Sequence, residues 1–242
     1  MIFSIPDRVT SRIGTAQGDP CAAALANLAR HTSRDTVLVA SSTARASLRD
    51  DAETDRLTSD DIDGLSIVVD DLGARGLDLV LHGSGGGLKA AAELVALLRG
   101  RYDSIRALVP EAALSALSLV AFVCDTVILP ESALLGVPQH GSQLPIESGE
   151  AADWVARNST QPNVANRVEL TTMIFDEDKS SDGPITARHA RDLGLQVHLV
   201  CDRSGIGSDL EAIGKPIENT FRAEALVKLI ENHKGHYYAV IS

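Results

Sequence analysis

The feature that most constrains the fold is an apolar segment that leads directly into a run of glycines. Residues 77–81 read Leu-Asp-Leu-Val-Leu, and glycine occupies positions 85–87. An apolar run of this length that ends at glycine predicts a buried strand, then a tight turn, then a helix over 88–100. Unpaired backbone amides at a helix start can hold an anion, so the same segment predicts an anion-binding loop.

Strand-like and helix-like segments alternate along much of the chain. We expect strands at 36–40, 77–81, 105–109, 126–129 and 196–200. We expect helices at 21–31, 60–74 (with Ser59 as N-cap), 88–100, 112–123, 150–157, 163–175, 186–193 and 222–233. This alternation predicts an α/β fold with a mainly parallel sheet between helices.

The length of 242 residues fits a single structural domain with a sizeable core. Residues 1–57 are expected to form an N-terminal arm, a helix and a strand, with an irregular start over 1–20 and a mobile loop at 41–56. Residues 58–200 are expected to form the core. Residues 201–242 are expected to form a C-terminal helical extension.

Charge and composition exclude several classes of function. The net charge is −11, which argues against nucleic acid as a partner, since phosphate contacts need clustered Lys and Arg. The apolar stretch 112–124 is shorter than the roughly 20 residues that span a bilayer, so we expect no transmembrane segment. The three cysteines have no metal-ligand spacing, which predicts no metal or cofactor and suits a reducing cytoplasm.

Several motifs occur in a characteristic order. They are Leu-Asp-Leu-Val-Leu-His-Gly-Ser-Gly-Gly (77–86), Val-Pro (109–110), Ala-Leu-Ser-Ala-Leu-Ser (113–118), Leu-Gly-Val-Pro-Gln (135–139) and the segment 182–197. Together they resemble the serine dehydrogenase proteinase family, a branch of the ClpP/crotonase superfamily. The resemblance implies a spiral of β-β-α units, a peptide or protein substrate, and assembly into a homo-oligomer.

The resemblance also implies a set of catalytic residues. Ser115 corresponds to the nucleophile, and the amides of Gly86 and Ala116 correspond to the oxyanion hole. His140 and Asp182 follow in the ClpP order of base and orienting carboxylate. A weak serine nucleophile needs such an adjacent base and donors for the developing oxyanion.

The sequence departs from the family at two places near the serine. His82-Gly83-Ser84 stands where the family has His-Thr-Pro, and Leu117 stands where it has glycine. Leu117 is therefore expected to narrow the substrate cleft. The element at 137–139 is also shorter than in the family. These departures favour, as an alternative, a catalytically inactive scaffold or regulatory oligomer with the same fold.

Other interpretations stay open at this level. Lys179 could serve as the base of a Ser–Lys dyad, and Ser115 could simply be a small polar residue that opens a helix. Crotonase-type acyl-CoA chemistry is a third option, although the sequence has no paired acid–base signature for it. We expect His82 to be a core histidine, His189 to be exposed, and Ser118 to face a neighbouring helix or to cap locally.

Overall fold

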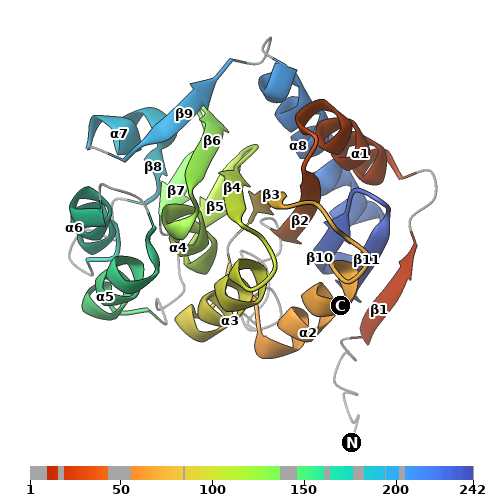
Figure 1. The fold of residues 1–242 in the computed structure, drawn as a ribbon, viewed down its shortest axis with the longest axis horizontal. Coiled ribbons are helices and arrows are strands. Elements are labelled where there is room, and N and C mark those ends of the chain that lie inside the picture. The colour runs from red at the N-terminus through yellow and green to blue at the C-terminus, as the bar shows by residue number, and fades with distance from the viewer. Residues whose placement is uncertain are drawn as a thin grey trace, which may run out of the picture.

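The computed structural model describes residues 10–15, 19–42, 56–83, 85–136, 146–160, 164–176, 183–193, 195–201 and 205–241. Within these ranges the chain has a mixed α/β fold, in which helices cover a large, mostly parallel sheet (Figure 1). The predicted α/β class is therefore confirmed. Residues 43–55, most of the predicted mobile loop, lie outside the described residues.

The parallel part of the large sheet consists of the strands predicted from the apolar runs. They are β2 (Asp35–Ser41), β3 (Gly76–His82), β4 (Ser104–Leu108), β6 (Thr126–Pro130) and β9 (Val197–Val200). They are neighbours in that order, and each pair is parallel. β3 is buried along its whole length, as expected for a parallel strand with helices over both faces.

Two hydrophobic clusters fill the two faces of the sheet. Leu77, Leu79 and Leu81 of β3 belong to the larger cluster, whereas Val80 belongs to the smaller one, because successive side chains of a strand alternate between faces. The larger cluster includes residues of α2 (Ser59–Val68), α3 (Leu88–Arg99) and α4 (Ala116–Val123) and extends to three later helices, whereas the helices of the smaller cluster are α1 (Pro20–Thr32) and α8 (Gly205–Ala223). Figure 1 shows α1 and α8 together on the side of the sheet opposite α2 and α3.

The C-terminal segment forms strands, so the predicted helix at 222–233 is wrong. β10 (Leu226–Asn232) and β11 (His236–Ile241) form an antiparallel hairpin, and β1 (Thr10–Thr15) pairs with β11 where an irregular arm was expected. Gly235, with φ +83, lies in the hairpin turn. β10 also pairs antiparallel with β2, which extends the large sheet to eight strands among the described residues.

α8 is a helix that the sequence analysis does not predict. Its glycines and Pro216 suggest a loop, yet the helix continues through Pro216. Buried Leu210, Ile213 and Ile217 recur at helical spacing and pack in the smaller cluster with α1. Tertiary burial therefore outweighs the low helix propensity of the glycines and the proline.

A small second sheet branches from the large one. It contains β5 (Ala112–Leu114), β7 (Leu134–Gly136) and β8 (Ile185–Thr186), and α5 (Ser148–Asn158), α6 (Val164–Ile174) and α7 (Ala187–Asp192) accompany it. The three helices agree with the predicted segments. The predicted helix start at 112 is wrong, because residues 112–114 pair with β7 and the helix begins at Ala116.

The boundaries of α2 differ from the prediction at both ends. Thr58, rather than Ser59, is the N-cap, and the Thr58 N–H donates to Asp61 Oδ2 at 2.6 Å in a capping box. The helix ends at Val68 instead of residue 74. Asp61 is buried and also accepts a hydrogen bond from Lys228 Nζ of β10 at 2.7 Å, which ties α2 to the hairpin.

A substitution of Gly64 tests the contact between α2 and the hairpin. A Cβ atom at Gly64 would lie 2.4 Å from Cγ of the buried Tyr238 ring. We expect Gly64→Ala to lower the free energy of unfolding by about 1–3 kcal/mol through overpacking. The matched control is Gly149→Ala in α5, where a Cβ meets nothing within 4 Å. That change should be neutral or stabilising by up to about 1 kcal/mol. Urea denaturation measures both, and equal effects would contradict the packing.

Candidate functional site

The site is built where the chain leaves the large sheet at the end of β3. Gly83 has φ +109, and its N–H donates to the Ala112 carbonyl at 2.9 Å. The Leu114 N–H in turn donates to the Gly83 carbonyl at 2.9 Å. The segment after β3 therefore pairs with β5, and this pairing brings the glycine run to the segment that carries Ser115.

Gly85 is in contact with the first turn of α4. It has φ +70, and a Cβ atom there would lie 2.6 Å from the Leu114 carbonyl oxygen, 2.7 Å from the Leu117 nitrogen and 3.0 Å from the Ala116 nitrogen. Both the backbone conformation and the lack of space require glycine at this position. At Gly87, the N-cap of α3, a Cβ atom would meet nothing within 4 Å. Glycine is therefore not required at this third position of the run.

The orientation of the Gly86 amide follows from its neighbour. The Leu57 N–H donates to the Gly85 carbonyl at 3.1 Å, so this carbonyl points at Leu57. Because the described peptides are trans, the Gly86 N–H points in the opposite direction, away from Leu57. The Gly86 carbonyl lies 3.3 Å from Ser115 Oγ, so the serine hydroxyl is next to this glycine.

Ser115 connects β5 to α4 in an unusual backbone conformation. Its φ of 52° and ψ of −126° lie outside the regions that non-glycine residues prefer. Its N–H donates to the Gly136 carbonyl of β7 at 2.6 Å, and its hydroxyl donates to the Gly86 carbonyl. The residue is 6% exposed. The helix that follows is buried at all of its positions, so the serine is held by packing as well as by hydrogen bonds.

Ser118 supports this conformation, a role that the sequence analysis does not predict. Its buried hydroxyl donates to the Ala113 carbonyl and accepts the Gly136 N–H at 2.7 Å. One side chain thereby connects β5, β7 and the first turn of α4. Of the two expectations for Ser118, a neighbouring helix or a local cap, the local bond to Ala113 is nearer to the second. In the sequence, Ser118 is recognisable only as a serine one helical turn after Ser115. Its role becomes clear once β5 and β7 are paired, because its hydroxyl bonds to both strands.

Other residues near the serine have the following positions. Leu117 is buried and belongs to the larger hydrophobic cluster. His82 is buried at the end of β3, and its Nε2 lies 3.2 Å from Glu218 Oε1 of α8, as expected for a core histidine. His189 on α7 is exposed, as predicted. These histidines give no base within the described part of the site.

The remaining predicted residues fall outside what the structure describes. His140, Asp182 and the alternative base Lys179 all lie in segments that are not described. The structure thus brings together Ser115, Gly86 and the first amides of α4, and the base is a matter for proposal. A hydroxyl beside backbone N–H groups at a helix start is an arrangement that can stabilise a developing oxyanion.

Comparisons with known proteins give limited additional information. No protein-family model matches the chain. An uncharacterized protein of Methanocaldococcus jannaschii is 30% identical, and the match covers 50% of this chain and 53% of that protein. The chain therefore spans about half the length of this curated relative.

Three solved structures are similar at low identity. ClpP1 from Listeria monocytogenes is 12% identical, with 71% of this chain and 94% of that chain covered and a TM-score of 0.42. The 1510-N membrane-bound stomatin-specific protease is 14% identical, with 64% and 79% covered and a TM-score of 0.47. An enoyl-CoA hydratase/isomerase family member is 16% identical, with 89% and 77% covered and a TM-score of 0.46. Nothing about function follows from values this low.

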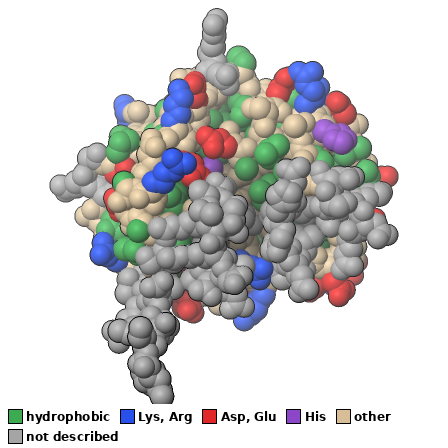
Figure 2. Space-filling model, turned by 180° about the vertical axis from the view of Figure 1, so that it is seen from behind, with side chains coloured by type: hydrophobic (Ala, Val, Ile, Leu, Met, Phe, Trp, Pro, Cys, Tyr) green, Lys and Arg blue, Asp and Glu red, His purple; other side chains and the backbone are tan. Residues whose placement is uncertain are grey.

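Two further features are the apolar character of the helices and the distribution of charge. None of the described helices has both the length and the apolar character needed to cross a bilayer. On the face shown in Figure 2, the basic side chains of the described residues are scattered among acidic ones rather than gathered in one cluster.

Serine substitutions in the glycine run test how tightly it packs against α4. We expect Gly85→Ser to lower the free energy of unfolding by about 2–4 kcal/mol, because a side chain there has both an unfavourable φ and a backbone clash. Gly87→Ser is the matched control, since the space is open and serine is a favoured N-cap. It should change stability by less than about 0.5 kcal/mol. Chemical denaturation of both variants measures this difference. If Gly85→Ser were as stable as the wild type, the close contact between Gly85 and α4 would be contradicted.

Proposed function

We propose that the chain is a ClpP-type serine hydrolase that cleaves peptide bonds through an acyl-enzyme on Ser115. The observation that carries this proposal is the backbone of Ser115, which combines φ 52° with ψ −126° next to the glycine run. Backbone strain of this kind costs about 1–3 kcal/mol and persists where the surrounding structure enforces it, often at active sites.

The backbone of Ser115 differs from that of Ser33, which also has a positive φ. Ser33 has φ 56° and ψ 36°, the ordinary left-handed conformation of a helix C-cap. Ser115 precedes a helix instead, and its ψ lies far from that region. A sharp turn between a strand and a helix that presents a serine is the arrangement that nucleophilic serines use in other hydrolase folds. The alternative that Ser115 has only a structural role as an N-cap is disfavoured, because its side chain makes no capping hydrogen bond.

The amides of Gly86 and Ala116 are our candidates for the oxyanion hole. Ala116 is the first residue of α4, so its N–H has no partner within the helix. No described residue accepts a hydrogen bond from either N–H. Gly85 holds the two segments in contact, which keeps the donors in place before a substrate arrives. Donors fixed in advance are the most effective kind for a developing oxyanion.

The proposed reaction has two steps. Ser115 Oγ attacks the peptide carbonyl as the base removes its proton, and the oxyanion forms at the Gly86 and Ala116 amides. Collapse of this intermediate breaks the C–N bond, and the leaving amine takes the proton from the base. Water then hydrolyses the acyl-enzyme by the same path. By resemblance His140 is the base and Asp182 orients it, with Lys179 as the alternative base.

The chain also carries an observation that favours a second candidate function. Ser115 is 6% exposed, and its hydroxyl donates to the Gly86 carbonyl. A serine held in this way fits a catalytically inactive scaffold or regulatory oligomer. For either function we propose, by resemblance, a homo-oligomer, and we propose a cytoplasmic location because Cys21 and Cys124 are buried free thiols.

Labelling with a fluorophosphonate probe tests the nucleophile. We expect the folded protein to be labelled covalently and Ser115→Ala to abolish labelling, because the probe reacts with an activated serine hydroxyl. Ser208→Ala on the exposed face of α8 is the control and should label like the wild type. Intact-protein mass spectrometry reads the adduct. Failure of the folded wild type to react would favour the scaffold instead.

Paired substitutions identify the base. If His140 is the base, His140→Ala should slow labelling by roughly 10²–10⁴-fold, whereas Lys179→Ala should leave the rate unchanged. The reverse pattern would assign the base to Lys179. Rates are compared at a fixed probe concentration, with circular dichroism as the folding control. If neither substitution changes the rate while Ser115→Ala abolishes labelling, both assignments are wrong.

A further inference from the structure

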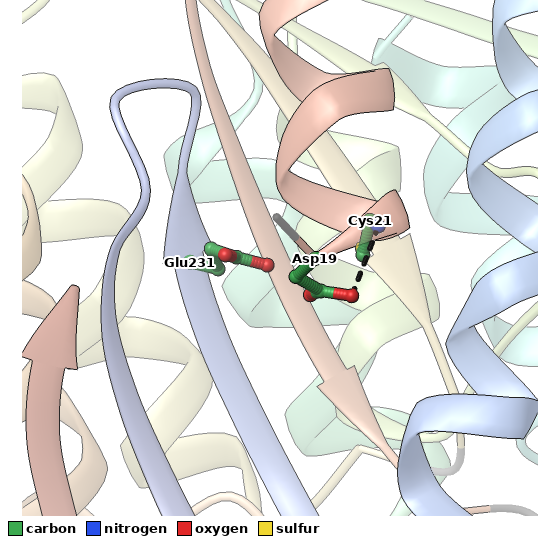
Figure 3. A group of neighbouring side chains, drawn as sticks. All are labelled: Asp19, Cys21 and Glu231. Carbon is green, nitrogen blue, oxygen red and sulfur yellow. Dashed lines mark hydrogen bonds between the residues drawn. The ribbon is translucent and has the colours of Figure 1, made fainter. Parts of the chain in front are cut away.

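Three potential metal ligands that are distant in the sequence converge at the start of α1. Asp19 is the N-cap of α1, Cys21 lies in its first turn, and Glu231 comes from β10. One ligand atom from each residue lies within 4.8 Å of the other two. Figure 3 shows the Glu231 carboxylate directed from its strand toward Asp19 and the helix start.

Glu231 is the unusual member of this group. It is 1% exposed, and neither of its carboxylate oxygens has a hydrogen-bond partner among the described residues. The Cys21 thiol lies beside it without meeting hydrogen-bond geometry. A buried carboxylate without a partner is expensive for a folded protein, and such groups normally pair or bind a cation.

The surroundings of Glu231 are acidic. Burial, followed by the charge of Asp19, raises the pKa of Glu231 to about 8, and Glu224 acts in the same direction. Burial, followed by the charges of Glu231 and Asp19, also raises the pKa of the Cys21 thiol. No lysine or arginine is among the groups that act on either residue. Burial and the neighbouring acids thus favour the protonated forms of Glu231 and Cys21, and a bound cation would take the place of these protons.

We propose that Asp19, Cys21 and Glu231 form a binding site for one zinc-class divalent cation. A thiolate with two carboxylates is a donor set that suits Zn²⁺, whereas Mg²⁺ and Ca²⁺ prefer oxygen ligands throughout. Water takes the fourth tetrahedral position, since Asp19 is partly exposed.

Small side-chain movements would complete the coordination. Tetrahedral Zn²⁺, with Zn–S near 2.3 Å and Zn–O near 2.1 Å, places its ligand atoms roughly 3.4–3.6 Å apart. The present separations are at most 4.8 Å and so exceed these values by no more than about 1.2–1.4 Å, which is within the reach of small χ rotations of Glu231 and Asp19. One Asp19 oxygen accepts the Cys21 N–H at 3.3 Å and leaves the second oxygen for the ion.

The helix dipole opposes a cation at this place, but the ligands outweigh it. The N-terminus of a helix carries an effective charge of about +0.5, whereas the deprotonated ligands would carry three negative charges. Binding would cross-link α1 to β10, two elements that are adjacent in the fold but about 200 residues apart in the sequence. The site is independent of Ser115, so its test does not depend on the proposed hydrolase activity.

A spectroscopic titration with Co²⁺ tests this proposal on the full-length protein freed of metal by chelation. We expect one equivalent of Co²⁺ to give a near-ultraviolet thiolate-to-cobalt charge-transfer band, and one equivalent of Zn²⁺ to abolish it. Cys21→Ser should remove the band, and Glu231→Gln should weaken affinity at least tenfold. Cys201→Ser is the control and should titrate like the wild type, because this cysteine is exposed and directly follows β9, which is separated from β10 by four strands of the sheet.

Thermal unfolding gives a second, independent measurement. Zn²⁺ should raise the melting temperature of the wild type and of Cys201→Ser, since a ligand that binds the folded state stabilises it. At the same Zn²⁺ concentration the rise should be smaller for Glu231→Gln, whose own cooperative unfolding transition shows that this variant is folded. The proposal is overturned if the folded wild type gives no band, or if the band depends on Cys201 instead of Cys21.

Discussion

The contact between Gly85 and the first turn of α4 is the constraint on which the site depends. Gly85 lies so close to the Leu114 carbonyl and the Ala116 nitrogen that no side chain fits between them. This contact fixes the distance between the loop after β3 and the start of α4. Gly83 makes it possible, because its pairing with residues 112–114 turns the chain from the large sheet into the small one. The hydroxyl of Ser115 then lies next to the Gly86 carbonyl.

Buried polar groups on both sides hold this arrangement. Ser118 joins β5 to β7 beneath Ser115. On the other side, Lys228 Nζ donates to the Arg56 carbonyl at 3.0 Å as well as to Asp61, and this fixes the segment whose Leu57 binds the Gly85 carbonyl. A polar or charged group is costly to bury without a partner. The Ser118 hydroxyl and the Lys228 ammonium find their partners only when the strands are in register. The C-terminal hairpin, which supplies Lys228, is therefore part of the support of the site.

The parallel strands and most helices can be predicted because their apolar residues repeat with a clear period. β3 and α3 are examples, and the glycine run between them marks the site. The C-terminal hairpin is missed because Arg222–His233 contains apolar residues at spacings that also fit a helix. Its strand conformation comes from pairing with β2 and β11, which are distant in sequence. α8 is missed because its glycines and Pro216 have low helix propensity. Burial of its apolar face against α1 nevertheless stabilises the helix.

The sequence by itself determined the α/β class, the glycine run and the serine that faces it, because these depend on local periodicity and on residue types with narrow conformational preferences. The tertiary structure alone decided the strained backbone of Ser115, the bonds of Ser118 and the meeting of Asp19, Cys21 and Glu231. Each of these depends on strand pairing or helix packing between segments far apart in the chain. Such contacts leave no spacing pattern in a single sequence, since they exist only after the sheet has formed.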